Sequence, residues 1–168
     1  MNDQRFFGKY RGIVSSVDDP LFTGRIKAKV PDVMGDTESG WALPCAPYGG
    51  KEMGFFCLPA EGANVWIEFE HGDPDYPVWT GCFWGAATDM PPTLNLPDPY
   101  KKIMLQTDGG HRIALDDTPA IGGISLETSD GMKITMNATG ITLDNGMGAK
   151  IELLATTVLV NDDGLMVI

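Results

Sequence analysis

The chain has 168 residues, of which 43 % are hydrophobic and 21 % charged, and it carries a formal net charge of −11 at pH 7. This acidic balance argues against DNA or RNA as a partner, because affinity for nucleic acids depends mainly on cationic contacts to phosphates. No apolar run approaches the roughly 18–20 residues that a transmembrane helix needs. The N-terminal residues "MNDQRFFGKYRG" lack the apolar core of a signal peptide. We therefore expect a globular protein that is made in the cytoplasm without a signal peptide.

Short strands are predicted at the start of the chain. The segment "YRGIVSSVDD" has strand-like alternation around Ile13, Val14 and Val17, and "DPLFTG" supplies turn residues after it. In "GRIKAKVPDV" three apolar residues alternate with three basic ones, which is the period-two pattern of a strand with one buried face. The apolar set is Ile26, Ala28 and Val30, and the basic set is Arg25, Lys27 and Lys29.

Three further stretches complete this unit. "WALPCAP" and "GFFCLPAEG" are typical of short strands bounded by Pro and Gly, and in "NVWIEFE" the residues Val65, Ile67 and Phe69 face one way. We expect "VMGDTESG" and "YGGKEM" to be loops, and we predict no helix. About five strands in roughly 80 residues favour a small Greek-key barrel.

The composition changes sharply near residue 100. All fifteen aromatic residues lie at or before Tyr100, and eleven of the twelve prolines lie at or before Pro99. The Pro-rich segment "GAATDMPPTLNLPDPYKK" marks the connection between the two halves. We therefore predict a barrel over residues 1–96, a join over 97–100 and a second all-β unit over 101–168.

The second half is a rough repeat of one short strand and one turn. Eight apolar pairs recur, and the first members of successive pairs are separated by 10, 11, 10, 7, 10, 7 and 7 residues. Turn-forming segments such as "TDGG", "SDG" and "NDDG" lie between them. The pairs are Ile103/Leu105, Ile113/Leu115, Ile124/Leu126, Ile134/Met136, Ile141/Leu143, Ile151/Leu153, Val158/Val160 and Leu165/Val167.

One copy of this repeat offers a thin interior. Each strand brings only two inward apolar side chains, worth a few kcal/mol at about 25 cal/mol per Å², against roughly 1–2 kcal/mol of backbone entropy per ordered residue. Three chains winding about a common axis would each supply a third of the interior, so a trimeric β-prism is the favoured interpretation, with the first seven pairs lining the axis. An open meander that packs on the first unit is the alternative.

The first unit also resembles a known family. The matching residues are "GIVSSVDDPLFTGRIKAKVPDV", Trp41 with Pro44 and Pro47, Leu58-Pro59 with Gly62, and above all "VWIEFEHGDPDYPVWTG" from Val65 to Gly81. They resemble the oligonucleotide/oligosaccharide-binding (OB) barrel of baseplate central spike proteins, which occur in contractile phage tails, extracellular injection particles and type VI secretion systems. The segment "GGHRIALDDT" resembles the entry into that family's β-helix.

The resemblance implies a non-enzymatic homotrimer, with an OB-fold barrel followed by a triple-stranded, intertwined β-helix that forms a needle. Such a spike sits on the tail-tube hub of a baseplate among other baseplate proteins. It pierces the target-cell envelope when the sheath contracts, and it resides in the assembled phage tail or injection particle. The join is too short for the lysozyme domain that some relatives carry.

The family also implies a role for the C-terminal end. Some relatives end in an iron-binding tip made by clustered histidines, but the two histidines here are His71 and His111, far from the end of the sequence. The apolar residues there could instead dock a PAAR-type cap protein. The predicted contact residues are Leu165, Met166, Val167 and Ile168.

Other chemistry-bearing residues are interpreted structurally. Glu68, Glu70, His71, Asp73 and Asp75 are taken as a solvated strand face followed by a turn rather than a metal or acid–base site. Asp116-Asp117 and Asp162-Asp163 are taken as turn residues, because Ca²⁺ requires about six or more oxygens. The cysteines Cys45, Cys57 and Cys82 lack metal-site spacing and are taken as buried fillers. No catalytic residue, cofactor or metal site is predicted.

A ligand-binding OB module without a piercing role is the alternative function. OB barrels bind glycans or nucleic-acid strands through aromatic platforms and basic grooves. The candidate platforms are Trp66, Trp79, Phe55 and Phe56, and the only basic stripe is that of Arg25, Lys27 and Lys29.

Overall fold

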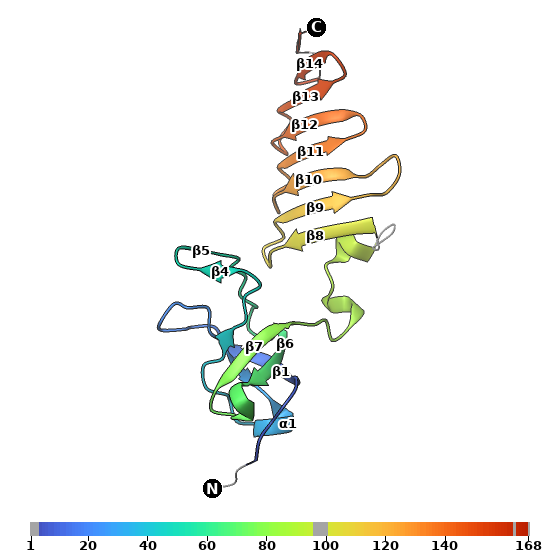
Figure 1. Ribbon diagram of the computed structural model, residues 1–168. Helices are drawn as coiled ribbons and strands as arrows, with labels where there is room; N and C mark the ends of the chain where they lie inside the picture. The colour runs from blue at the N-terminus through green and yellow to red at the C-terminus, as the bar shows by residue number, and fades with distance from the viewer. Residues whose placement is uncertain (1–3, 96–100, 163, 168) are drawn as a thin grey trace. The chain divides into compact units, whose positions relative to one another are not determined.

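The protein consists of two compact units. The computed structural model describes residues 4–95, 101–162 and 164–167, and its units span Met1–Asp89 and Met90–Ile168 (Figure 1). The predicted join at 97–100 and the predicted tip residue Ile168 lie outside the described residues.

The N-terminal unit is built on a five-stranded sheet. Its strand order is β2-β1-β6-β7-β3, and all pairings are antiparallel except the parallel pair of β3 and β7. Its strands are β1 (Tyr10–Ser16), β2 (Lys27–Lys29), β3 (Leu43–Pro44), β6 (Asn64–Phe69) and β7 (Pro77–Cys82). Short 3-10 turns follow at η1 (Glu70–Gly72) and η2 (Ala87–Asp89), and η3 (Pro92–Asn95) opens the second unit.

The core of this unit lies on the strand faces that the period-two patterns predicted. Ile26, Ala28 and Val30 are fully buried, as are Val65 and Ile67, whereas the intervening residues of β6 are only half-buried. Alternate side chains of a strand project to opposite faces, so one face of each strand meets the core. The buried set is Val14, Ile26, Ala28, Val30, Ala42, Val65, Ile67 and Phe69.

Three expectations for this unit are wrong. The segment expected as a loop from Val33 begins inside a short helix, α1 (Pro31–Met34), which starts at a proline and ends where the Gly35 N–H donates to the Pro31 carbonyl at 3.0 Å. Proline is favoured in a first helical turn and glycine just after the last one. The second expected loop holds a hairpin of β4 (Gly49–Gly50) and β5 (Met53–Gly54).

The cysteines are the third correction. Cys45, Cys57 and Cys82 are exposed thiols rather than buried fillers. Short strands bounded by Pro and Gly place many side chains at the barrel surface, so apolar sequence surroundings did not predict burial here. Partial burial raises the pKa of the Cys82 thiol, which disfavours its reactive thiolate.

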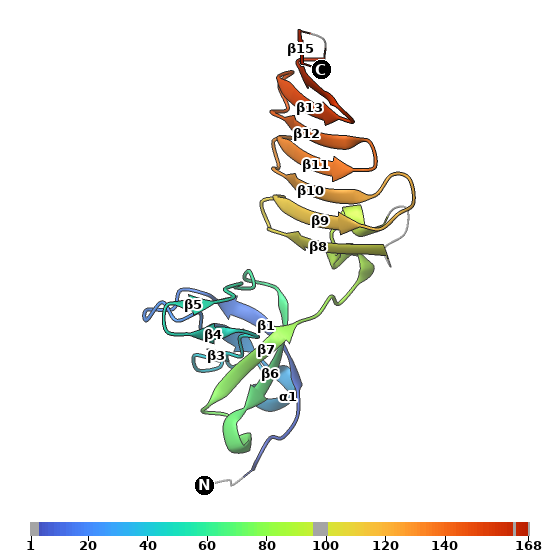
Figure 2. The ribbon, with the colours of Figure 1, turned by 45° about the horizontal axis from the view of Figure 1, so that its top comes forward.

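The C-terminal unit is an eight-stranded antiparallel meander. Each strand pairs with its sequence neighbour, in the order β15-β14-β13-β12-β11-β10-β9-β8 (Figures 1 and 2). The strands are β8 (Lys102–Gln106), β9 (Arg112–Asp116), β10 (Gly123–Glu127), β11 (Lys133–Asn137), β12 (Gly140–Asp144), β13 (Lys150–Leu154), β14 (Thr157–Val160) and β15 (Leu165–Val167).

This arrangement matches the predicted repeat of one strand and one turn. Within the described residues, strands β9 to β14 have a hydrogen-bonded neighbour from the same chain on both sides, and β8 and β15 are the outer strands. A β-helix made by three chains requires three copies, so that part of the fold stays a prediction. Over the described ranges, no helix is both long and apolar enough to span a membrane.

Candidate functional site

Two parallel columns of aliphatic side chains run across one face of the C-terminal sheet. Ile103 lies opposite Leu115, which in turn lies opposite Ile124, and the same register continues strand by strand. Residues two apart on a strand share a face, so each strand from β8 to β14 adds one residue to each column, and β15 adds Leu165 to the second. Column A holds Ile103, Leu115, Ile124, Met136, Ile141, Leu153 and Val158, and column B holds Leu105, Ile113, Leu126, Ile134, Leu143, Ile151, Val160 and Leu165.

This aliphatic face is open to solvent in a single chain. Apart from Val160, the side chains of both columns are between 36 % and 73 % exposed, whereas Ser125, Thr135 and Thr142 on the opposite face are half-buried. Full burial of a Leu or Ile gives about 1.5–3 kcal/mol, so roughly 1 kcal/mol per residue of both columns remains available on association. Contiguous apolar patches of this kind mark interaction surfaces.

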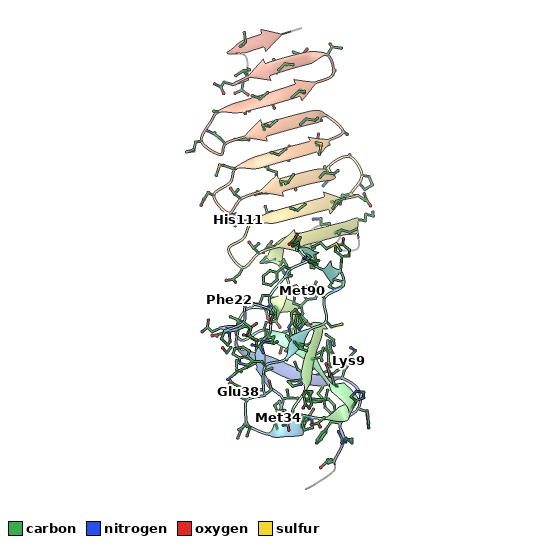
Figure 3. The ribbon with its side chains drawn as sticks, turned by 60° about the vertical axis from the view of Figure 1, so that its left-hand side comes forward. Lys9, Phe22, Met34, Glu38, Met90 and His111 are labelled. Carbon is green, nitrogen blue, oxygen red and sulfur yellow. The ribbon has the colours of Figure 1, made fainter. Side chains whose placement is uncertain are left out.

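A groove of about 860 Å³ follows column B along one edge of the sheet. Its side wall is formed by the loops 107–111, 128–132 and 145–149, which we call the long-loop edge. Figure 3 labels His111 in the first of these loops. Each loop is braced by its first residue. The Thr107 and Thr128 hydroxyls accept the backbone N–H four residues later at 3.2 and 3.1 Å, and the Asn145 amide oxygen does so at 2.9 Å.

The opposite edge is built differently, and we call it the short-turn edge. It has the two-residue turns 138–139 and 155–156 and the longer loop 117–122. Asp116 braces the longer loop, since the Thr118 hydroxyl and N–H donate to its carboxylate at 2.5 and 2.8 Å. These bonds, helped by Lys102, lower the pKa of Asp116, as the predicted turn role would require.

A ladder of alternating charges crosses the half-buried face beside the long-loop edge. Its members face one another in register: Arg112, Glu127, Lys133, Asp144 and Lys150. Glu127 lies 2.6 Å from Arg112 and 3.8 Å from Lys133. Opposite charges directly across a pair stabilise a sheet, whereas a register slipped by two residues would leave Glu127 opposite Ala114 or Thr135 instead of a cation. The ladder therefore helps to fix which strands pair.

The ladder was missed at the sequence level, although a signal existed. Arg112, Lys133 and Lys150 each precede the first isoleucine of their strand, and Glu127 and Asp144 end the strands before two of them. Lys150 also contacts Asp162, and Glu152 at 3.3 Å. The hydrogen bond that Lys150 donates to Asp162, followed by the one that it donates to Glu152, raises the pKa of Lys150. Asp162 is thus an ion-pairing turn residue.

Comparison with known proteins assigns both units. Residues 10–84 match the model of the type VI secretion system/phage-baseplate injector OB domain. Residues 102–166 match the phage baseplate V C-terminal trimerisation domain, which covers the strands that carry both columns. The chain belongs to the phage baseplate V family.

Relatives of this baseplate V chain include spike proteins of type VI secretion systems. It is 33 % identical over 73 residues to the spike protein VgrG5 of Pseudomonas aeruginosa and 30 % identical over 89 residues to the spike protein VgrG3 of Vibrio cholerae. It is 34 % identical over 89 residues to the actin cross-linking toxin VgrG1 of Vibrio cholerae. These matches cover 44–51 % of the chain but only 8–9 % of each relative.

The injector OB domain holds a buried carboxylate that organises the loop between β1 and β2. Asp19 is buried and accepts the N–H groups of Leu21 and Thr23 at 3.0 and 2.8 Å. Arg25 donates Nε and Nη2 to it at 3.0 and 2.5 Å. The Arg25 guanidinium, with the backbone donors, holds the pKa of Asp19 far below its usual range.

This rigid loop presents an apolar tip. Phe22 is 93 % exposed and has a φ of 54°, which is unfavourable for a residue other than glycine (Figure 3). Its neighbour Leu21 is also largely exposed. The Asp19 network stabilises a conformation that the loop residues would not adopt by preference.

The predicted basic stripe is largely neutralised within the domain. Arg25 pairs with Asp19, and Lys27 pairs with Glu38 at 2.9 Å. Both cations also lie over the ring of Trp41, at 5.5 and 5.1 Å from its centroid. A groove for a phosphate backbone needs uncompensated cations, so this stripe does not favour nucleic-acid binding.

The candidate aromatic platforms do not form one surface feature. Trp79 donates its indole N–H to the Gly24 carbonyl at 3.1 Å. Trp66 stacks on Phe83 with ring centroids 4.6 Å apart. Phe55 and Phe56 follow the β4–β5 hairpin and are exposed. Two of the four candidates are thus held by contacts within the domain.

The acidic run around His71 does not converge. Glu68 pairs with Lys9 at 2.6 Å, and Asp73 pairs with Arg5 at 3.3 Å and caps the turn by accepting the Asp75 N–H at 3.1 Å. Over the described ranges, no group of three or more His, Cys, Asp or Glu side chains is arranged to hold a metal ion. Glu68 and Asp73 thus make ion pairs within the domain, and Asp73 also braces the turn.

Proposed function

We propose that three copies of this chain form the central spike of a contractile particle, which pierces a target-cell envelope when the sheath contracts. The exposed aliphatic columns carry this proposal, since a surface of that size on a trimerisation domain calls for further copies to cover it. The relatives named as type VI spike proteins support the role in a particle. The spike acts mechanically, without catalysis.

The columns suit three copies better than one. With three sheets around an axis parallel to the columns, every strand level contributes six inward aliphatic side chains, two per copy. An interior of that kind buries both columns along the whole sheet. It also adds to the barrier to unfolding, because all three sheets must separate before any column is hydrated. A needle that is pushed through an envelope requires such resistance.

Native mass tests this proposal directly. The full chain should have about three times its mass of 18.1 kDa in native mass spectrometry or light scattering. The trimer should persist on dilution to nanomolar concentration, because subunits with so much buried apolar surface separate slowly. A folded monomer of 18.1 kDa would contradict the spike.

We further propose that the barrel end seats on a tail-tube hub and that the far end of the sheet docks a PAAR-type cap. The outer strand β15 favours the proposed cap site. Leu165 on this strand is 57 % exposed, and an outer strand offers unpaired backbone groups. Met166 and Val167 share that strand. The predicted contact of Ile168 lies outside the described residues.

Co-elution with the PAAR-type protein of the same particle tests the cap. Met166→Asp should abolish co-elution while leaving the trimer mass unchanged, because it places a charge at a predicted cap contact on β15 that belongs to neither column. Thr135→Asp, in the middle of the sheet and outside both columns, is the matched control and should leave cap binding and the trimer mass intact. If the unaltered chain and its cap candidate elute separately, the chain does not use this end for a cap.

A further inference from the structure

From β11 to β14, the two edges of the C-terminal sheet are unequal in shape and in side-chain size. Met147 on the long-loop edge is 83 % exposed, and Met132 on the same edge is also exposed. The turns 138–139 and 155–156 on the short-turn edge both consist of an alanine and a threonine, and all four residues are exposed. Flexible methionine side chains fill irregular gaps well, and small turn residues leave such gaps.

The edges are also staggered along the sheet. In a meander, successive connections alternate between the two edges, so each long loop lies one strand level away from the nearest short turn. The loop 145–149 joins β12 and β13, whereas the turns 138–139 and 155–156 join β11 to β12 and β13 to β14. Strand levels are about 4.8 Å apart. The loop 145–149 of one sheet therefore matches the gap between the turns 138–139 and 155–156 of another sheet at the same height.

Three-fold symmetry determines which edges can meet. In a closed ring of three, each copy uses one surface toward one neighbour and a different surface toward the other, since self-matching contacts generate only dimers. When the three-fold axis runs parallel to the columns, each strand lies at the same height along the axis as the same strand of the two neighbouring copies. The two surfaces of a sheet in such a ring are its two edges.

We propose that each long-loop edge packs on the short-turn edge of the next copy, with the loop that carries Met147 seated between the turns 138–139 and 155–156. The occupant of the groove beside column B is thus the short-turn edge of a second copy. This inference rests on the proposed trimer and adds how its copies meet: at each of the interfaces, the long-loop edge of one copy contacts the short-turn edge of the next. The bracing of the long loops keeps this edge preformed.

Disulfide trapping tests the direction. Met147→Cys and Thr139→Cys, combined in the full chain, lie on opposite edges of one sheet and one strand level apart. Five residues of strand separate them by about 17 Å within one copy, whereas a disulfide needs Cα atoms about 4–7 Å apart. We expect oxidation to convert most of the protein into a covalent trimer on non-reducing gels. Peptide mass spectrometry should identify the 147–139 link apart from the native Cys45, Cys57 and Cys82.

Matched variants make the result decisive. Each single variant should form no link at the new cysteine. The double variant His111→Cys with Thr156→Cys also places one cysteine on each edge. These two positions are about five strand levels, or roughly 24 Å, apart along the sheet, so this double variant should not cross-link. Dimers from Met147→Cys alone would mean a self-matching contact and would overturn the inference. A native trimer without the 147–139 link would overturn it too and leave the spike standing, while a native monomer would overturn both.

Discussion

Replacing Ile134 with aspartate should abolish the trimer. Ile134 lies in column B between Leu126 and Leu143 on the neighbouring strands, at the middle of the sheet. Three copies would place three carboxylates together near the axis, and an unpaired charge buried on association costs at least about 3–5 kcal/mol. Light scattering should report a mass near that of one chain at concentrations where the unaltered protein is a trimer.

Thr135→Asp is the matched control for this experiment. Thr135 is the next residue on β11, so its side chain lies on the half-buried face of the sheet, away from the columns. It pairs in register with Ser125 and Thr142 on the neighbouring strands. The same charge in the same strand should therefore leave the trimer mass unchanged. If Ile134→Asp remains a trimer with unaltered heat resistance, column B does not line an interior.

Patterns of period two predicted much of the fold. Ile26, Ala28 and Val30 alternate with three cations, and only one orientation of that strand hides its apolar residues. In the second half, the pairs beginning at Ile103 repeat at strand-turn intervals, so the strands and the face they share followed from spacing alone. Such patterns predict the apolar face of each strand well, because successive side chains of a strand point to opposite faces whatever the strand pairs with.

Features that depend on which residues meet across the sheet were not predictable in the same way. The ladder of Arg112, Glu127 and Lys133 becomes a ladder only once the register is known. The two unequal edges likewise follow from the order of loop lengths combined with the meander topology. Sequence spacing gives each strand separately, whereas register and edge shape belong to pairs of strands.

Local context explains the errors in the barrel. Pro31 and Gly35 are helix boundary signals, but they enclose only four residues, too few for a helical hydrophobic period to be visible. Asp19 lies in the turn segment that the sequence predicts, but its burial was not predicted, because it depends on Arg25, six residues later, folding back on it. A carboxylate with both a cation and backbone donors can be buried, and a pattern of hydrophobicity cannot reveal that.

Asp19→Ala should destabilise the barrel more than any other single truncation in the loop between β1 and β2. It removes the acceptor of the Leu21 and Thr23 N–H groups and leaves the half-buried guanidinium of Arg25 without its carboxylate. Groups left unsatisfied on burial carry the full desolvation penalty. All four tryptophans lie before residue 85, so the urea midpoint followed by tryptophan fluorescence reports the barrel separately from the C-terminal sheet.

Asp18→Ala is the matched control for Asp19→Ala, since Asp18 is the exposed neighbour and its loss removes the same formal charge. Its midpoint should stay close to that of the unaltered chain.

The loss of stability caused by Asp19→Ala, relative to the unaltered barrel, should also depend on pH. A carboxylate with a lowered pKa stabilises the folded state fully above its unfolded pKa of about 4, and this contribution is lost as the pH falls toward the folded value. The gap between Asp19→Ala and the unaltered barrel should therefore be constant near neutral pH and narrow below about pH 4. Equal midpoints for the two variants at pH 7 would mean that the Asp19–Arg25 pair does not hold this loop in place.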